Sequence, residues 1–277
     1  MGLRVNTNIM SMSAQRNLST VTERLGGNFM RLSSGLRVAS ASDDPAGLGI
    51  SERMRAQIRS LGQASRNAQD GSSLAQTAEG ALAEVHSSLH RMRELAIQAS
   101  NGTYSTDDRS VLDVEFQAII AEIDRIANST EFNGIPLLDG SQASVTIQVG
   151  LENAVSDTIT VGLQDVGAAA LGLSGGTFDV TDVANAQGVL AALDTATNSV
   201  NTARGNLGAS QNRLQSTIRS ILNVRENLSA AESRIRDVDV AAETADLTRN
   251  SIMQQAATSI LSQANSQPQI ALSLLQG

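Results

Sequence analysis

The sequence contains no cysteine, no lysine and no tryptophan, and only 2% of its 277 residues are aromatic. Without cysteine, the chain has no disulfides, no thiolate nucleophile and no cysteine metal ligand. With so few aromatic rings, a compact core around a cofactor is hard to assemble, so small and aliphatic side chains must fill the interior. These residue types favour helices that pack closely along their length.

Charge and hydrophobic patterning narrow the classes of partner. The formal net charge is -8, and every basic residue is an arginine. No window supplies the basic stripe that nucleic acid requires, so nucleic acid is not an expected partner. No run of about 18 apolar residues occurs, which predicts no membrane insertion. The first residues lack the apolar core of a cleaved signal peptide, which taken alone points to the cytosol.

Apolar side chains recur at alternating spacings of four and three in two long stretches, which is the pattern of a heptad seam. The C-terminal seam comprises Val189, Leu193, Ala196, Val200, Ala203, Leu207, Ser210, Leu214, Thr217, Ile221, Val224, Leu228, Ala231, Ile235 and Val238. The N-terminal seam comprises Met54, Ile58, Leu61, Ser65, Ala68, Ser72, Ala75, Ala78, Leu82, Val85, Leu89, Met92, Ala96 and Ala99. Each seam predicts a helix roughly 75 Å long.

A third, shorter stripe comprises Leu112, Phe116, Ile119, Ile123 and Ile126. The three stripes can bury one another, so the predicted fold is mainly α: an elongated antiparallel coiled-coil rod of three helices.

Local signals mark where these helices begin. Asp44 followed by Pro45 is a typical helix start, because the carboxylate caps free N–H groups and proline suits the first helical position. Ser105 followed by Asp108 resembles a capping box at the start of the third helix.

The segment between the two long seams predicts a turn and a small sheet. Asn133 and Gly134 are expected to end the third helix, and Pro136 prevents its continuation. A period of two then appears at Val145, Ile147 and Val149, and again at Ile159, Val161 and Leu163. We therefore expect a small β-hairpin within about residues 137–165.

Weaker apolar patterns occupy the two ends of the chain. Isolated helices of this kind are marginal in water, so they should need partners from other subunits. The residues expected at this assembly interface are Val5, Ile9, Leu18, Val21, Leu25, Ile252, Ala256, Ile260, Ile270 and Leu274.

The strongest candidate for catalytic chemistry is a set of three polar residues at spacings of four. His86, His90 and Glu94 share a helix face with a spacing that suits zinc. No HExxH motif accompanies them and no fourth ligand is suggested, so a solvated helix face is the favoured interpretation. Asp43 and Asp44 are better explained as helix caps than as an acid pair. We expect no catalytic residue, cofactor or metal.

Five blocks of the sequence resemble bacterial flagellins. They lie at residues 5–18 (VNTNIMSMSAQRNL), 31–58 (RLSSGLRVASASDDPAGLGISERMRAQI), 91–102 (RMRELAIQASNG), 131–140 (EFNGIPLLDG) and 234–275, which begins RIRDVDVAAETADLTRN. The resemblance implies a non-catalytic subunit that polymerises into the flagellar filament for motility. Two alternatives remain: the hook–filament junction protein, which shares the terminal helices, and an enzyme on a coiled-coil scaffold.

The resemblance also implies an arrangement and a set of partners. Residues 1–42 and 241–277 would form a discontinuous inner helical domain, and residues 43–240 an outer rod domain. Export without a cleaved signal peptide would move the protein from the cytosol to the cell exterior. The implied partners are copies of the chain itself, the flagellar cap, the hook–filament junction proteins and a secretion chaperone.

A host Toll-like receptor is a further implied partner. The family's receptor-contact residues match Arg91, Leu95 and Glu115 of this sequence. All three lie off the predicted seams, which suggests that they are exposed, and subunit packing is the competing interpretation.

Overall fold

A computed structural model describes residues 7–175 and 178–275, with side chains described as far as residue 268 in the last helix. In that part of the chain the helices are α1 (Ile9–Ser34), α2 (Pro45–Ala99), α3 (Thr106–Ser129), α4 (Val183–Arg236) and α5 (Val240–Leu275). The strands are β1 (Glu131–Phe132), β2 (Ile135–Pro136), β3 (Ser144–Gln148) and β4 (Thr158–Gly162). The predicted mainly α fold with a small hairpin is confirmed.

The chain divides into two compact units. Met1–Ala56 and Asn227–Gly277 form unit 1, and Gln57–Glu226 forms unit 2. Among the described residues, no helix combines the length and apolarity that crossing a membrane requires.

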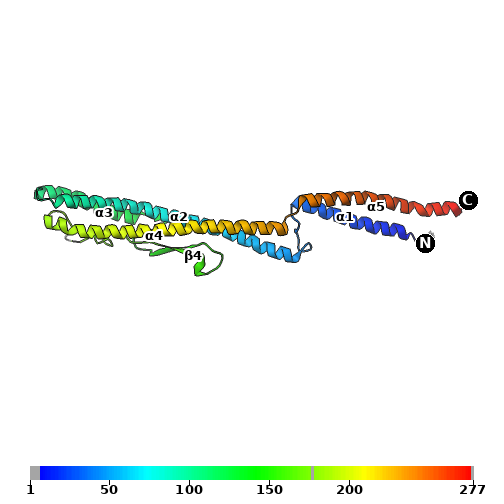
Figure 1. The fold of residues 1–277 in the computed structure, drawn as a ribbon, viewed down its shortest axis with the longest axis horizontal. Helices are drawn as coiled ribbons and strands as arrows, with labels where there is room; N and C mark the ends of the chain where they lie inside the picture. The colour runs from blue at the N-terminus through cyan, green and yellow to red at the C-terminus, as the bar shows by residue number, and fades with distance from the viewer. Residues whose placement is uncertain (1–6, 176–177, 276–277) are drawn as a thin grey trace. The chain divides into compact units, whose positions relative to one another are not determined.

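In unit 2 the helices α2 and α4 run antiparallel with α3 beside α2 (Figure 1). The predicted seams form the core of this unit. On α2, Ala68, Ala75, Ala78, Leu82, Val85, Leu89, Met92, Ala96 and Ala99 are buried. On α4, buried side chains follow the seam from Val189 to Leu214 and then Ile221. Phe116 and Ile123 of α3 are fully buried, as the third stripe predicts.

The α4 seam is less buried toward its C-terminal end. Val224 is 45% exposed, and Leu228, Ala231 and Ile235 are only half-buried. In unit 1, ion pairs join the end of α4 to the start of α2: Arg55 to Glu232 at 3.8 Å, and Arg236 to Glu52. These apolar seam residues thus remain partly open.

The predicted helix starts are confirmed. Asp44 Oδ1 accepts hydrogen bonds from the backbone N–H groups of Ala46 (3.1 Å) and Gly47 (2.9 Å) at the start of α2. Ser105 and Asp108 form a reciprocal capping box at the start of α3.

The predicted end of the third helix is wrong. α3 ends at Ser129, and Asn133 and Gly134 instead form the two-residue turn of the β1–β2 hairpin. Both have positive φ angles, 51° and 75°, and positive φ at both central positions is the requirement of a type I′ turn. Asn-Gly satisfies it with little strain, so this dipeptide marks a hairpin rather than a helix end.

The predicted hairpin is confirmed as β3 and β4, and it docks on α2. In β3 and β4, Val145 pairs with Val161 and Ile147 with Ile159. Asn67 on α2 donates its side-chain amide to the carbonyl of Gln148 at 3.0 Å. Gly71 allows strand β3 to approach α2 closely, because a Cβ atom at this position would lie only 2.9 Å from Ile147 Cγ1.

Candidate functional site

In unit 1, α1 and α5 pack along each other as an antiparallel pair. At one end, Asn8 donates its side-chain amide to the carbonyl of Ala264 at 2.7 Å, and Ser11 donates to Asn265 Oδ1 at 2.6 Å. At the other end, Arg31 Nε lies 3.0 Å from a Glu243 oxygen. Two segments from opposite ends of the sequence therefore form one helical pair.

The apolar core of this pair is thin. Among the described side chains of α1 and α5, the buried apolar ones are Ala14, Val21 and Ala264. Asn28 is buried as well, and Ala14, Val21 and Asn28 follow one another at intervals of seven. The fully buried positions of the α1 surface that meets α5 are therefore a heptad stripe of small or polar residues.

The structure separates the predicted assembly residues into two groups. Val21 is 5% exposed in the pair, with Leu18 and Leu25 half-buried on the same stripe. The exposed group is Ile9 (58%), Ile252 (61%), Ile260 (57%) and Ala256. Val5 lies outside the described residues, and the side chains of Ile270 and Leu274 lie outside the described part of α5.

The C-terminal stripe of Ile252, Ala256 and Ile260 thus does not face α1. The half-buried face of α5 carries Leu247, Gln254 and Leu261, together with Glu243, Asn250 and Ala257. Helix α5 carries apolar residues on two faces. The predicted assembly residues lie on the face that α1 does not cover.

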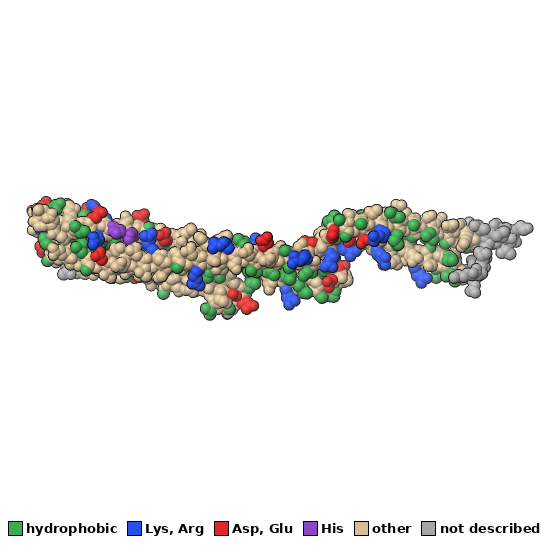
Figure 2. Space-filling model, in the orientation of Figure 1, with side chains coloured by type: hydrophobic (Ala, Val, Ile, Leu, Met, Phe, Trp, Pro, Cys, Tyr) green, Lys and Arg blue, Asp and Glu red, His purple; other side chains and the backbone are tan. Residues whose placement is uncertain are grey.

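Further exposed apolar side chains escaped the sequence analysis. Their exposed fractions are 57% for Met10 and Phe29, 69% for Met30, 59% for Val240 and 44% for Met253. Figure 2 shows hydrophobic side chains scattered over the surface of α1 and α5. The signal that would have found them is the presence of large apolar residues outside any intramolecular heptad seam, on helices otherwise rich in small polar residues.

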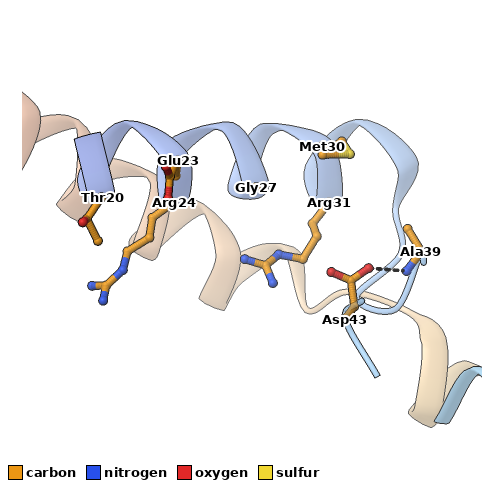
Figure 3. Close-up of a pocket in the computed structure, with 8 residues that line it drawn as sticks. All are labelled: Thr20, Glu23, Arg24, Gly27, Met30, Arg31, Ala39 and Asp43. Atoms are coloured by element: carbon orange, nitrogen blue, oxygen red, sulfur yellow. Dashed lines mark hydrogen bonds between the residues drawn. The ribbon is translucent and has the colours of Figure 1, made fainter. Parts of the chain in front are cut away.

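A polar cleft lies between α1 and the loop that follows it (Figure 3). It has a volume of about 370 Å³ and is lined by Thr20, Glu23, Arg24, Gly27, Met30, Arg31, Ala39 and Asp43. Asp43 Oδ2 accepts hydrogen bonds from the backbone N–H groups of Ala39 (3.2 Å) and Ser40 (2.9 Å). These bonds, those from Ser40 above all, hold the pKa of Asp43 below its usual range. Asp43 thus shapes the loop and caps no helix, so the capping interpretation holds for Asp44 and is wrong for Asp43.

In unit 2, Arg91 and Glu115 form an exposed ion pair between α2 and α3. Arg91 Nη2 lies 2.7 Å and Nε 2.8 Å from Glu115 Oε1, and Nη1 lies 3.1 Å from Glu94 Oε2. Hydrogen bonds to Glu115 first and Glu94 second raise the pKa of Arg91. Two of the three residues assigned to receptor contact are therefore adjacent and at the surface.

The prediction that Leu95 lies off the core is wrong, because its side chain is fully buried. Helix α2 contacts both α3 and α4, so its buried surface is wider than a single seam. Neighbouring residues are buried together at Leu74 and Ala75, and again at Leu95 and Ala96. The heptad pattern identified one edge of this surface and missed the other.

The two histidines face each other rather than a shared ligand. His90 Nε2 lies 2.9 Å from His86 Nε2, while Glu94 pairs with Arg91 instead. The pKa of His86 is lowered, mainly because the ring is partly buried and to a smaller extent because His90 and Arg204 lie nearby. Within the described residues no three His, Asp or Glu side chains group as metal ligands would.

Comparisons with known proteins match most of the chain. The model of the bacterial flagellin N-terminal helical region matches residues 5–143, and that of the C-terminal helical region matches residues 190–275. A flagellin of Halalkalibacterium halodurans is 49% identical over 98% of this chain and 99% of its own length. A Bacillus subtilis flagellin is 45% identical over 99% of this chain and all of its own length.

Solved structures agree at the level of the fold. A Bacillus cereus flagellin structure covers 60% of this chain and 94% of its own, at 35% identity and a TM-score of 0.51. A putative flagellar hook-associated protein of Vibrio parahaemolyticus covers 70% of this chain and all of its own, at 18% identity and a TM-score of 0.59. The second likeness is one of fold alone.

Proposed function

Since this chain belongs to the bacterial flagellin family, and is therefore a structural subunit of the extracellular flagellar filament rather than an enzyme, we propose that it polymerises through the exposed faces of α1 and α5. In this proposal residues 1–42 and 241–277 form the inner tier of the filament. Residues 43–240 form the outer rod.

The observation that carries this proposal is the exposure of large apolar side chains on a helix pair with a thin core. Ile9, Ile252 and Ile260 are each more than half exposed, while the pair buries mainly small side chains. Covering a large aliphatic side chain contributes about 1.5–3 kcal/mol. Neighbouring copies therefore supply burial that the single chain lacks.

The test is substitution of the exposed stripe of α5. Ile252→Gln with Ile260→Gln should abolish or strongly slow filament growth, while circular dichroism shows unit 2 still folded. Val111→Gln with Val114→Gln, a comparably exposed apolar pair on α3 of unit 2, is the control and should retain growth. Electron microscopy under polymerising conditions reads the result, and normal filaments from the double variant would refute this use of α5.

The hook–filament junction protein is the alternative function. The 18% identity to a hook-associated protein supports a shared fold only, whereas flagellins align over nearly the whole chain at 45–49% identity. These alignments favour the filament subunit. Quantitative proteomics distinguishes the two, because a filament subunit is present in far more copies per flagellum than a junction protein.

We propose three further partners, which the resemblance to flagellins implies: a secretion chaperone, the flagellar cap and the hook–filament junction proteins. A secretion chaperone would bind the C-terminal segment, whose exposed apolar residues need cover before assembly. The cap and the hook–filament junction proteins would contact the growing and anchored ends of the filament. Binding of the purified chain to each partner, measured with and without residues 241–277, tests this assignment.

We further propose that Arg91 and Glu115, together with the buried Leu95 four residues further along α2, form the site for a host Toll-like receptor. The support is an exposed, pre-arranged ion pair on the family's matching block. An arginine at the centre of an interface typically costs about 2 kcal/mol or more when truncated. Arg91→Ala monomers should signal at least about tenfold less, while Arg125→Ala, which removes an exposed arginine elsewhere on α3, should signal normally.

A further inference from the structure

A polar network is buried inside the α1/α5 pair. Asn250 donates its side-chain amide to Asn28 Oδ1 at 2.8 Å, and Asn28 donates its own amide to Glu243 Oε1 at 2.6 Å. Arg31 Nε donates to the same oxygen at 3.0 Å. Asn28 is only 3% exposed, and the Glu243 side chain is 13% exposed. We refer to Asn28, Asn250, Glu243 and Arg31 as the polar node.

The node occupies a position where an apolar residue would ordinarily be expected. Asn28 continues the stripe of Ala14 and Val21, so it stands at a seam position of the helix pair. A buried amide is costly unless its donor and its acceptor both find partners. Here the oxygen of Asn28 is used by Asn250 and its NH₂ group by Glu243, and both partners lie on α5.

This arrangement makes one alignment of the helices preferable to its neighbours. Sliding α5 by one heptad moves it about 10 Å along α1. Because Glu243 and Asn250 are themselves seven residues apart, the slide brings one of them to the place of the other, so Asn28 keeps one partner and loses the second. Apart from the backbone hydrogen bonds that join residues 35–38 to residues 236–238, the rest of the stripe repeats leucines and small apolar residues at heptad intervals, so it opposes a slide of one heptad weakly. In helix pairs, a buried polar residue at a seam position fixes the register at some cost in stability.

We propose that the polar node is the register lock of the α1/α5 pair, and that it determines which self-contacts a neighbouring copy can make. The proposal rests on the assembly role of these helices. The exposed stripe of α1, with Ile9, and that of α5, with Ile252 and Ile260, lie on different helices. Their alignment along the pair is set only by the register. In a pair that slips by one heptad, the two stripes are displaced along the helix axis relative to each other. A neighbouring copy then cannot contact both stripes at once.

Cysteine cross-linking reads the register directly, because the natural chain has no cysteine to interfere. Ser11→Cys with Asn265→Cys reports the observed alignment, since these side chains are in contact. Ser11→Cys with Thr258→Cys reports a slide of one heptad. Each pair is introduced into the parent, into Asn28→Leu with Asn250→Leu, and into Asn17→Leu. The last is an exposed asparagine of α1 and serves as the matched control.

In the parent and the control, oxidation should link residues 11 and 265 and leave 11 and 258 unlinked. The double leucine variant should give both cross-links, with undiminished helix content, and its filament growth without the added cysteines should slow at least severalfold. If it links only 11 and 265 and grows filaments at the parent rate, the node is not a register lock. A parent that cross-links correctly but forms no filament would instead overturn the proposed function.

Discussion

The heptad pattern occurs in both units of this chain, but the two units bury different kinds of residue along it. In unit 2 the seams alternate alanines with large side chains that are fully buried, as with Leu82, Leu89 and Leu193. In the α1/α5 pair of unit 1, the fully buried side chains are alanines, one valine and an amide, the leucines of the stripe are only half-buried, and the isoleucines are exposed. A heptad seam thus predicts helix pairing, whereas the size of its residues indicates whether that pairing is self-sufficient.

The sharpest test of this contrast is hydrogen exchange on dilute monomer. Amides of α2 and α4 should be protected up to the global unfolding free energy, about 5–15 kcal/mol for a typical domain, whereas amides of α1 and α5 should exchange almost freely. In assembled filaments the α1 and α5 amides should become protected. Strong protection of α1 in the monomer would remove the basis of the comparison.

A second test compares truncations in the two seams. Leu89→Ala leaves a cavity in a fully buried site and should lower the unfolding free energy of the monomer by about 2–5 kcal/mol. Val21→Ala should barely alter monomer unfolding, yet should raise the concentration needed for polymerisation. Chemical denaturation and a sedimentation assay measure the two effects. Equal losses of monomer stability would mean that the α1/α5 pair folds by itself.

A third test concerns how tightly unit 2 is packed. Gly71→Ala places a methyl group against Ile147, and overpacking of this kind costs typically about 1–3 kcal/mol. That cost offsets the roughly 1 kcal/mol that alanine gains over glycine inside a helix. Gly80→Ala on the same helix meets nothing within 4 Å and should be stabilising. If both variants gain equally in thermal unfolding, the hairpin is docked loosely.

The smallest expected effect is the pH dependence of the histidine pair in unit 2. The pKa of His86 is lowered, so the folded state prefers the neutral ring, and the associated stability is present at neutral pH and lost as the pH falls below the unfolded value. Thermal unfolding of the monomer should shift slightly downward between pH 7.5 and pH 5. The His86→Gln variant should lose the part of this pH-dependent shift that His86 causes. If the variant and the parent show the same pH profile, the histidine pair does not affect stability. Zinc should leave both proteins unaffected.

Periodicity and capping signals were sufficient to predict most of unit 2 and the start of α2 in unit 1. The seams on α2 and α4, the Asp44–Pro45 start, the Ser105–Asp108 box and the β3–β4 hairpin are local patterns, because each depends on residues close in sequence. The filament-subunit role, which rested on the resemblance of five sequence blocks, is confirmed by family membership.

What could not be predicted depends on which helices meet. Leu95 is buried because α2 contacts two helices at once, and a single seam does not reveal a second neighbour. Ile252 and Ile260 are exposed because α5 presents a different face to α1. The Asn28–Asn250 contact joins residues 222 positions apart, and neither amide differs in sequence from an exposed one.

The hydrogen bond from Asn8 to the carbonyl of Ala264 has a consequence for the timing of folding. Helix α5 continues through Pro268, which has no N–H to offer the carbonyl four residues earlier, and that carbonyl belongs to Ala264. The first turn of α1 therefore repairs a backbone defect in α5, across a separation of 256 positions. A chain synthesised only as far as residue 263 cannot make this bond, because the acceptor is the carbonyl of Ala264. The pair is thus a late-forming element of high contact order.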